Sequence, residues 1–355
     1  MRVGILSYPM LFQREGGLQI QVRETMAALQ RSQARPPLSL EVELVDPNRS
    51  RLADYDVIHV FSAINGNHRI VESASEQGVP VVLSPLVSPA WNHGSGWRAH
   101  LAECLAGRLT AWDVQTSYAQ TKRALQLARR VIALGEAERD AIVAAFHIDA
   151  VKIQILPNGI SPHFFTADAE LFRRETGIAA PFVLMVGTIS PYKNQLGLVQ
   201  ALAESDLPIV MIGRPQRHDL AYLQQLLQVP HVTWLGELQH AHPLLASAYA
   251  AAAVVALPSQ GEVFPLAVLE ALAAGTPVVM TADSALSLPN AGFALKKVRW
   301  DDAPGQRRAI LGLLAARPQR AAVSKLVQHF TWERVAAQIA DCYFELAGEG
   351  AAHVV

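Results

Sequence analysis

Cysteine is scarce in this sequence, which holds only Cys104 and Cys342 among its 355 residues. Two cysteines so far apart argue against a disulfide framework or a zinc site, and they suit a reducing compartment. No run of about 18 uninterrupted apolar residues occurs, so we expect no transmembrane helix. The first residues carry no long apolar region, so we also expect no signal peptide and a cytoplasmic location.

An excess of one charge is also missing, because 30 Lys and Arg against 31 Asp and Glu give a formal net charge of −1. This balance offers no overall electrostatic reason to expect a nucleic acid partner. The sequence has no Gly-x-Ser-x-Gly elbow, no Walker loop, no paired CxxC and no Gly-x-Gly-x-x-Gly. Hydrolase, nucleoside triphosphatase, zinc-binding and nicotinamide-dependent functions therefore lack support.

The sequence is rich in apolar residues, which make up 51% of it and suffice for two packed cores. Short apolar strands alternate with helices, a pattern that predicts an α/β fold with parallel sheets and right-handed crossovers. The turn signal Pro157-Asn-Gly-Ile160 interrupts this alternation. We therefore predict an N-terminal domain over residues 1–165, a C-terminal domain over residues 166–330, and a last helix over residues 331–348.

Three predicted strands of the C-terminal half end at a glycine, namely Gly187, Gly213 and Gly236. Ligands of open α/β sheets bind outside the carboxyl ends of the strands, where glycine lets a backbone approach them closely. Lys193 and Arg214 follow two of these glycines, so we predict that they hold a diphosphate. The alternative is that both cations are simply solvated. Because this half contains no Asp-x-Asp motif, we expect no divalent metal.

The stretch from Leu257 to Gly275 carries two further charged candidates, Glu262 and Glu270. A strand ending at Leu257 is followed by a loop and by a helix that starts near Pro265 and ends before Gly275. This helix is apolar all round apart from Glu270, so the carboxylate needs a partner or a function. Glu270 could accept hydrogen bonds from ribose hydroxyls, and Glu262 could stabilise positive charge that develops during sugar transfer. The alternative is a solvent-facing glutamate on an amphipathic helix.

The N-terminal half gives weaker signals. Gly16-Gly17 separates the first predicted strand from a helix, an arrangement that can bind an anion but that is also common in plain turns. The histidines have no metal-ligand spacing, and the best functional candidate is His93, in a loop predicted over residues 85–96. Residues 97–130 hold six basic and two acidic residues, with Trp97 and Trp112 among them. This segment could contact an anionic membrane, or its helices could have ordinary solvated faces.

The paired glutamates stand in Pro-Ser-x-x-Glu-x-Phe-x-x-x-x-x-Glu-Ala-x-Ala-x-Gly-x-Pro-Val-Val, and with this block the chain resembles a retaining glycosyltransferase of family 4. The resemblance implies a GT-B fold, in which two Rossmann-like domains with parallel sheets face a central cleft. It implies that the last helix packs back onto the N-terminal domain. It also implies that Glu262 contacts the donor sugar, that Glu270 holds the ribose, and that Lys193 and Arg214 hold the diphosphate. The other residues it assigns to the nucleotide sugar are Gly16, Gly17, Gly187, Thr188, Gly213, Glu237, Val263, Phe264, Pro265 and Leu266.

The implied reaction moves a sugar, such as mannose or a related hexose, from a nucleoside diphosphate sugar to a hydroxyl. The acceptor would be a glycan or a lipid-linked acceptor, and no cofactor or metal would be required. The histidine that many relatives carry after the fourth strand is absent here, which leaves Ser84 or His93 as candidates on the acceptor side. Two alternatives stay open: an epimerase or phosphorylase on the same fold, and a non-catalytic subunit that binds a nucleotide and a partner.

Overall fold

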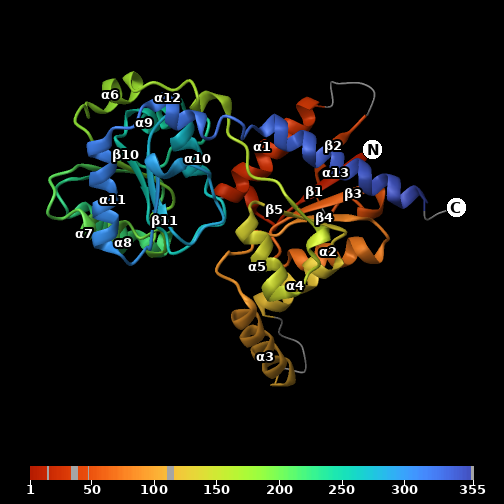
Figure 1. The fold of residues 1–355 in the computed structure, drawn as a ribbon. Helices are drawn as coiled ribbons and strands as arrows, with labels where there is room; N and C mark the ends of the chain where they lie inside the picture. Colours follow the sequence, from red (N-terminus) through yellow and green to blue (C-terminus); the bar gives the residue numbers. More distant parts are fainter. Residues whose placement is uncertain (14–15, 33–38, 47, 110–115, 353–355) are drawn as a thin grey trace. The chain divides into compact units, whose positions relative to one another are not determined.

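The computed structural model describes residues 1–355 except for 14–15, 33–38, 47, 110–115 and 353–355. The chain forms two compact units, each built around its own parallel sheet (Figure 1). Unit 1 comprises Met1–Gly159 and Trp332–Val355, and unit 2 comprises Ile160–Thr331. The chain therefore leaves unit 1 after Gly159, a few residues before the predicted division after residue 165, and returns to it at Trp332.

The sheet of unit 1 contains six parallel strands in the order β2-β1-β3-β4-β5-β6. They are β1 (Arg2–Leu6), β2 (Glu41–Leu44), β3 (Val57–Phe61), β4 (Val81–Ser84), β5 (Arg130–Ala133) and β6 (Ile153–Ile155). Every residue of β3 and β4 is buried, as expected for parallel strands that are covered on both faces. The winding direction changes between β1 and β3, which makes the carboxyl ends of these two strands the crevice of the unit.

The helices of unit 1 lie on both faces of its sheet (Figure 1). On one face α1 (Gly17–Ser32) packs against α13 (Trp332–Ala352), the last helix of the chain. The other face carries α2 (Asn67–Glu76), α4 (Ser117–Leu127) and α5 (Glu136–Phe146), and α3 (His93–Leu109) packs on α4 and α5. The buried residues of α13 recur at helical spacing and form one apolar stripe. They are Trp332, Val335, Ala336, Ile339, Cys342, Tyr343 and Leu346.

The sheet of unit 2 also contains six parallel strands, in the order β12-β11-β10-β7-β8-β9. They are β7 (Val183–Val186), β8 (Ile209–Ile212), β9 (Val232–Trp234), β10 (Val254–Leu257), β11 (Val278–Thr281) and β12 (Leu295–Val298). The first strand, β7, lies inside the sheet, and the chain builds outward from it first on one side and then on the other. The winding direction therefore changes between β7 and β10, where a ligand crevice is expected.

The helices of unit 2 lie on both faces of its sheet (Figure 1). One face carries α7 (Gln195–Ala201), α8 (Leu220–Leu227) and α11 (Ala303–Ala316), and the other carries α6 (Glu170–Thr176), α9 (Pro243–Ala251), α10 (Leu266–Ala273) and α12 (Arg320–Lys325). All residues of α10 except Ala267 are buried. The sequence predicted this buried helix, with its start near Pro265 and its end before Gly275.

The two crossings between the units run side by side. Ile160 forms a parallel β-bridge with Thr331, and its N–H donates to the carbonyl of Phe330 at 2.9 Å. A Cβ atom on Gly159 would lie 2.5 Å from the backbone nitrogen of Trp332, so only glycine fits at this position. The turn predicted at Pro157-Asn-Gly-Ile160 thus coincides with a close approach of two chain segments.

Some predictions about local structure were wrong. The loop predicted over residues 85–96 ends early, because α3 begins at His93. Both β12 and α6 were missed, since β12 is the four-residue strand Leu-Lys-Lys-Val at a sheet edge, with two exposed lysines, and α6 is short and mostly polar. Part of the predicted basic segment, including Trp112, lies outside the described residues.

Candidate active site

The three strand-end glycines lie next to one another at the carboxyl edge of the sheet of unit 2. Gly187, Gly213 and Gly236 follow the adjacent strands β7, β8 and β9, and the N–H of Gly213 donates to the carbonyl of Gly236 at 2.7 Å. A Cβ atom on Gly213 would lie 1.9 Å from the carbonyl oxygen of Gly187, so this glycine is required by a neighbouring backbone. A Cβ atom on Gly187 would make only an ordinary contact with Lys193 Cε at 3.8 Å, and one on Gly236 would meet nothing, but the φ values of 148° and 81° favour glycine at both positions.

Lys193 and Glu262 meet at the point where the winding direction of unit 2 changes. Lys193 ends the short 3₁₀ turn Pro191–Lys193 after β7, and Glu262 lies in the loop after β10. The Lys193 ammonium donates to the Glu262 carboxylate at 2.5 Å, and the two side chains are only 23% and 14% exposed. The sequence predicted both residues at this edge but gave no sign that they pair with each other. While Lys193 and Glu262 are paired, each charge neutralises the other.

The loop that carries Glu262 is held on its far side by the segment after β11. The N–H of Glu262 donates to the carbonyl of Asp283 at 2.8 Å, and the residue forms a parallel bridge with Ser284. The N–H of Ala285 and the hydroxyl of Ser284 both donate to the carbonyl of Val263. The residues after Glu262 are thereby fixed where α10 begins, with Phe264 and Leu266 buried and Pro265 as the N-terminal cap.

Arg214 and Glu237, two other predicted ligands of the nucleotide sugar, pair at the ends of β8 and β9. Arg214 Nη1 lies 3.5 Å from Glu237 Oε2, and the Arg214 side chain is 62% exposed. An ion pair this exposed contributes little to stability, so the guanidinium is available to an anion at small energetic cost. Thr188 lies in the loop between Gly187 and Lys193, where its carbonyl accepts from the Gln195 side chain at 2.9 Å.

Each carboxylate oxygen of Glu270 has one polar side-chain partner inside unit 2. Its carboxylate accepts a hydrogen bond from the Tyr249 hydroxyl at 2.9 Å, and His240 Nε2 lies 2.9 Å from its other oxygen. The residue is 4% exposed and the Tyr249 side chain is fully buried. Burial, followed by the charge of Glu270, raises the pKa of Tyr249 well above its usual value, so the hydroxyl remains a donor. A ribose at Glu270 would have to use the remaining lone pairs of these oxygens.

The predicted candidates of unit 1 come from three segments of the chain, at the start of α1, at the end of β4 and at the start of α3. Gly16 and Gly17 are exposed at the start of α1. His93 is exposed as the first residue of α3, which corrects its predicted place in a loop. Ser84 ends β4, is 2% exposed, and lies with its hydroxyl 2.9 Å from His59 Nε2. His59 Nδ1 in turn lies 2.6 Å from the Tyr343 hydroxyl, which α13 supplies.

The sequence assigned no role to two buried ionisable residues of unit 1, His59 and Glu138. Burial lowers the pKa of His59 to about 3, so the ring is neutral. Glu138, at the start of α5, accepts hydrogen bonds from the N–H groups of Val87 and Leu134, both at 2.7 Å. Burial raises the pKa of Glu138 to about 7, although both N–H donors favour the charged form. The only sequence signal was position, because His59 stands in the middle of an apolar strand.

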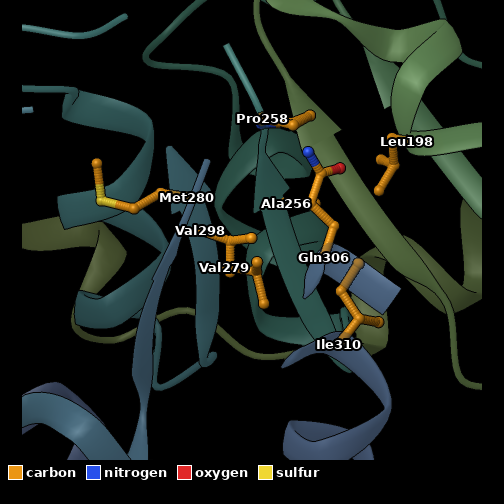
Figure 2. A pocket seen from close by; sticks show the side chains of 8 residues that line it. All are labelled: Leu198, Ala256, Pro258, Val279, Met280, Val298, Gln306 and Ile310. Carbon is orange, nitrogen blue, oxygen red and sulfur yellow. The ribbon is translucent and has the colours of Figure 1, made fainter. Parts of the chain in front are cut away.

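Figure 2 shows a pocket between the sheet of unit 2 and α11. Apart from Gln306, whose amide nitrogen donates to the carbonyls of Arg299 and Trp300, its lining is apolar. An apolar lining with one amide offers no positive charge to a diphosphate, so we interpret this pocket as a packing gap in the core. Its lining residues are Leu198, Ala256, Pro258, Val279, Met280, Val298, Gln306 and Ile310.

Neither a metal site nor a membrane span is found in the described part of the chain. None of its His, Cys, Asp and Glu side chains gather in groups of three or more that could hold an ion. Among the described helices, none combines the length and the apolar character needed to cross a bilayer. Both cysteines are outside disulfides.

Two doubly wound units, with a charged pair at the crevice of the second, define a protein of the GT-B class. Solved structures of this class superpose on the whole chain. Sucrose-phosphate synthase from Thermosynechococcus elongatus gives a TM-score of 0.72 at 19% identity and covers 98% of this chain and 99% of its own. Anabaena Alr3699/HepE, solved in complex with UDP, gives a TM-score of 0.69 at 18% identity and covers 97% and 100%. The expected GT-B fold is confirmed.

The sequence comparisons name the family. The profile described as "Glycosyl transferases group 1" matches residues 168–287, and the "Glycosyl transferase 4-like domain" matches residues 14–159. The chain therefore belongs to the family 4 type of glycosyltransferases. It is 31% identical over 246 residues to a D-inositol 3-phosphate glycosyltransferase of Geodermatophilus obscurus, covering 63% of this chain and 54% of that protein.

A phosphatidyl-myo-inositol mannosyltransferase of Mycolicibacterium smegmatis is 32% identical over 234 residues, which cover 62% of this chain and 58% of that protein. This chain thus spans about half the length of the curated relatives that it matches. Family membership follows from these matches, whereas the substrates and the reaction must be argued from the site.

Proposed function

We propose that this protein is a retaining glycosyltransferase that moves a sugar from a nucleoside diphosphate sugar to a hydroxyl group. The observation that carries the proposal is the Lys193–Glu262 pair, which lies at the winding reversal of unit 2. This is the place where open α/β sheets bind ligands. Family membership supports the same reaction class.

Each member of the pair has a separate role in this proposal. The Lys193 ammonium binds the donor diphosphate, and Arg214 can add a second positive charge from the end of β8. Glu262 is released from Lys193 when the diphosphate arrives and turns to the donor sugar. There its carboxylate stabilises the oxocarbenium-like transition state. Glu270 holds the ribose at the buried end of the same site.

The chemical step follows a front-face course in this proposal. The bond between the anomeric carbon and the diphosphate oxygen breaks, and a bond to the acceptor oxygen forms on the same face of the sugar. The proton of the acceptor hydroxyl passes to the leaving diphosphate, so no protein base is needed. Lys193 and Arg214 stabilise the charge on the leaving group, which is why we propose that the reaction needs no metal ion.

Replacing Glu262 tests this proposal directly. We expect Glu262→Gln to lower turnover of a nucleoside diphosphate sugar by about 100-fold or more, since one group that stabilises the transition state is lost. The affinity for the nucleoside diphosphate should stay equal or rise, because Lys193 no longer has a competing carboxylate. UDP-glucose and GDP-mannose serve as donors, with turnover followed as release of the diphosphate and affinity measured by titration calorimetry.

Glu204→Gln is the matched control, because Glu204 also pairs with a cation in unit 2, Arg307, but lies in an exposed turn after α7. It should leave turnover within about twofold of the parent, as exposed pairs contribute little. Turnover of Glu262→Gln close to that of the parent would exclude the proposed role. A parent protein that binds nucleotides without any turnover would instead favour the non-catalytic subunit.

For the acceptor, we propose that unit 1 binds a glycan or lipid-linked acceptor and that α3 contacts the membrane surface. Trp97 is 64% exposed and Leu101, one turn later, is 43% exposed, with the exposed Arg98 between them. Apolar and basic side chains that project together are typical of helices that lie in an anionic interface. The cytoplasmic face of a membrane fits this arrangement and the two reduced cysteines.

Vesicle binding tests the membrane contact. The parent protein should sediment with vesicles that contain phosphatidylglycerol, and less so at high salt. The double variant Trp97→Ser with Leu101→Ser should sediment several-fold less. Leu220→Ser removes an equally exposed leucine from unit 2 and should sediment like the parent. Equal sedimentation of all three proteins would rule out α3 as the contact.

A further inference from the structure

Two loops of unit 2 that are far apart in sequence are fastened to each other beside the Lys193–Glu262 pair. The Tyr192 hydroxyl donates to the carbonyl of Gly261 at 2.6 Å. The N–H of Gln260 donates to the carbonyl of Tyr192 at 2.9 Å. Tyr192 thus makes one hydrogen bond with its side chain and one with its backbone, and both reach the loop after β10.

The position of these contacts gives them a particular consequence. Lys193 directly follows Tyr192, and Glu262 directly follows Gly261. A hydrogen bond between Tyr192 and Gly261 therefore fixes the backbone from which each charged side chain starts. On its far side the loop of Glu262 is held by Asp283 and Ser284. Toward β7 it is held by the two hydrogen bonds of Tyr192 and by the Gln260 side chain, whose amide nitrogen donates to the Pro191 carbonyl at 3.4 Å.

The chemistry of Tyr192 suits this task. Its side chain is half exposed, with 51% of the residue accessible, and yet its hydroxyl is bonded to a carbonyl rather than left to solvent. Partial burial, followed by the charge of Glu262, raises the pKa of Tyr192, so the hydroxyl stays protonated and can donate. A Cβ atom on Gly261 would lie 3.4 Å from this hydroxyl, which is ordinary van der Waals contact, so the tyrosine ring end lies directly against this part of the loop.

We propose that Tyr192 is a positioning residue that sets the spacing between the Lys193 ammonium and the Glu262 carboxylate. This inference rests on the proposed function, in which Lys193 holds the diphosphate and Glu262 faces the sugar. When these hydrogen bonds join the two loops, the Lys193 ammonium and the Glu262 carboxylate stay at a fixed distance from each other. Lys193 can then stabilise the leaving diphosphate while Glu262 stabilises the positive charge on the sugar. Without the hydroxyl, the donor would still bind through Lys193, but Glu262 would be out of place for part of the time.

Tyr192→Phe tests this role, because it removes the hydroxyl and keeps the ring and the backbone bond. We expect turnover of the nucleoside diphosphate sugar to fall about threefold to tenfold, the equivalent of one hydrogen bond. The affinity for UDP or GDP should change less than about twofold, since Lys193 is untouched. In a Glu262→Gln background the same substitution should have no further effect on turnover, because the residue that it positions is already gone.

Tyr222→Phe is the matched control. Tyr222 is another half-buried tyrosine of unit 2, and its hydroxyl accepts the N–H of Leu196 at 2.9 Å without touching the loop of Glu262. Any effect of this variant on turnover should multiply with that of Glu262→Gln. Effects of Tyr192→Phe that also multiply with Glu262→Gln would overturn the positioning role, and so would parent-like turnover of Tyr192→Phe.

A second measurement does not depend on transfer. In the parent protein the Lys193 amine is engaged by Glu262, so its acetylation by acetic anhydride, followed by mass spectrometry, should be slow. Tyr192→Phe should raise that rate about threefold to tenfold while Lys297, a lysine of β12 whose ammonium donates to the Ser284 carbonyl at 3.2 Å, keeps its rate. An unchanged Lys193 rate overturns the inference. If the parent neither binds nor turns over nucleotides while Tyr192→Phe still shows faster labelling of Lys193, only the proposed function is overturned.

Discussion

Replacing Tyr249 with phenylalanine removes one hydroxyl from unit 2 and tests why a carboxylate lies in the apolar helix α10. The hydroxyl donates to Glu270 at 2.9 Å, and both residues are buried. The variant leaves one oxygen of Glu270 without this donor in a place that water does not reach. If these hydrogen bonds hold α10 on α9, their loss must appear as lost stability even without any nucleotide.

The expected size follows from the charge of the acceptor. A hydrogen bond to a charged group contributes about 1.5–3 kcal/mol. For a domain of about 150 to 250 residues, each kcal/mol shifts the melting temperature by about 2–4 °C. We therefore expect the transition of unit 2 to fall by about 3–12 °C in Tyr249→Phe.

Differential scanning calorimetry of the full chain without nucleotide measures this shift. Tyr222→Phe is the reference, since its hydroxyl accepts from a neutral backbone N–H and is only half buried, which predicts a loss of about 0.5–1.5 kcal/mol. If Tyr249→Phe melts like the parent, or loses no more than Tyr222→Phe, then Glu270 is not anchored by Tyr249. In that case a role in ligand binding would have to explain the buried carboxylate alone.

Three further predictions follow from the packing and the charges. Gly213→Ala should lower the stability of unit 2 by about 2 kcal/mol or more, because its Cβ atom would clash with Gly187. Gly236→Ala should lower the stability by only about 1 kcal/mol, because its Cβ atom has open space and only the positive φ is strained. Equal melting temperatures of the two variants would contradict this prediction. Glu138 has a folded pKa of about 7, raised from 4.5, so its contribution is present below about pH 4.5 and is lost as the pH rises through 7. The stability advantage of the parent over Glu138→Gln, measured by urea unfolding, should therefore shrink by about 3 kcal/mol between pH 4.5 and pH 8, and parallel pH profiles would show that this carboxyl does not titrate. Finally, excess EDTA should leave sugar transfer unchanged, and a loss of turnover that Mg²⁺ restores would contradict the proposed mechanism.

The sequence predicted the fold well because the fold depends on patterns that local physics can detect. Apolar runs bounded by glycine and proline marked most strands. Helix α10 was predicted because it is apolar on every face apart from Glu270, which is not the composition of a surface helix. The edge strand β12 escaped because its four residues include Lys296 and Lys297, which resemble a loop in isolation. The start of α3 was missed because Gly94 and Gly96 disfavour a helix locally, although packing on α4 and α5 overrides that preference.

The strand-end positions of the candidate site residues could be predicted, but their contacts could not. Strand-end position is visible in a sequence, so Lys193 and Glu262 could be assigned to one edge. Their pairing could not, since it depends on the sheet order that makes β7 and β10 neighbours. The partners of Glu270 were hidden for the same reason, because His240 and Tyr249 come from other segments and carry no motif that marks them.

Unit 1 consists of two chain segments, one before unit 2 in the sequence and one after it, and this has a consequence for folding during synthesis. Unit 2 is one continuous segment, so it can complete its core while α13 has still to be synthesised. Until α13 arrives, α1 lacks its packing partner, and His59 lacks the Tyr343 hydroxyl inside an apolar sheet. The half of the protein whose residues come first should therefore be the half that finishes folding last, and a chain cut before Trp332 should keep unit 2 intact but leave unit 1 exposed to aggregation and proteolysis.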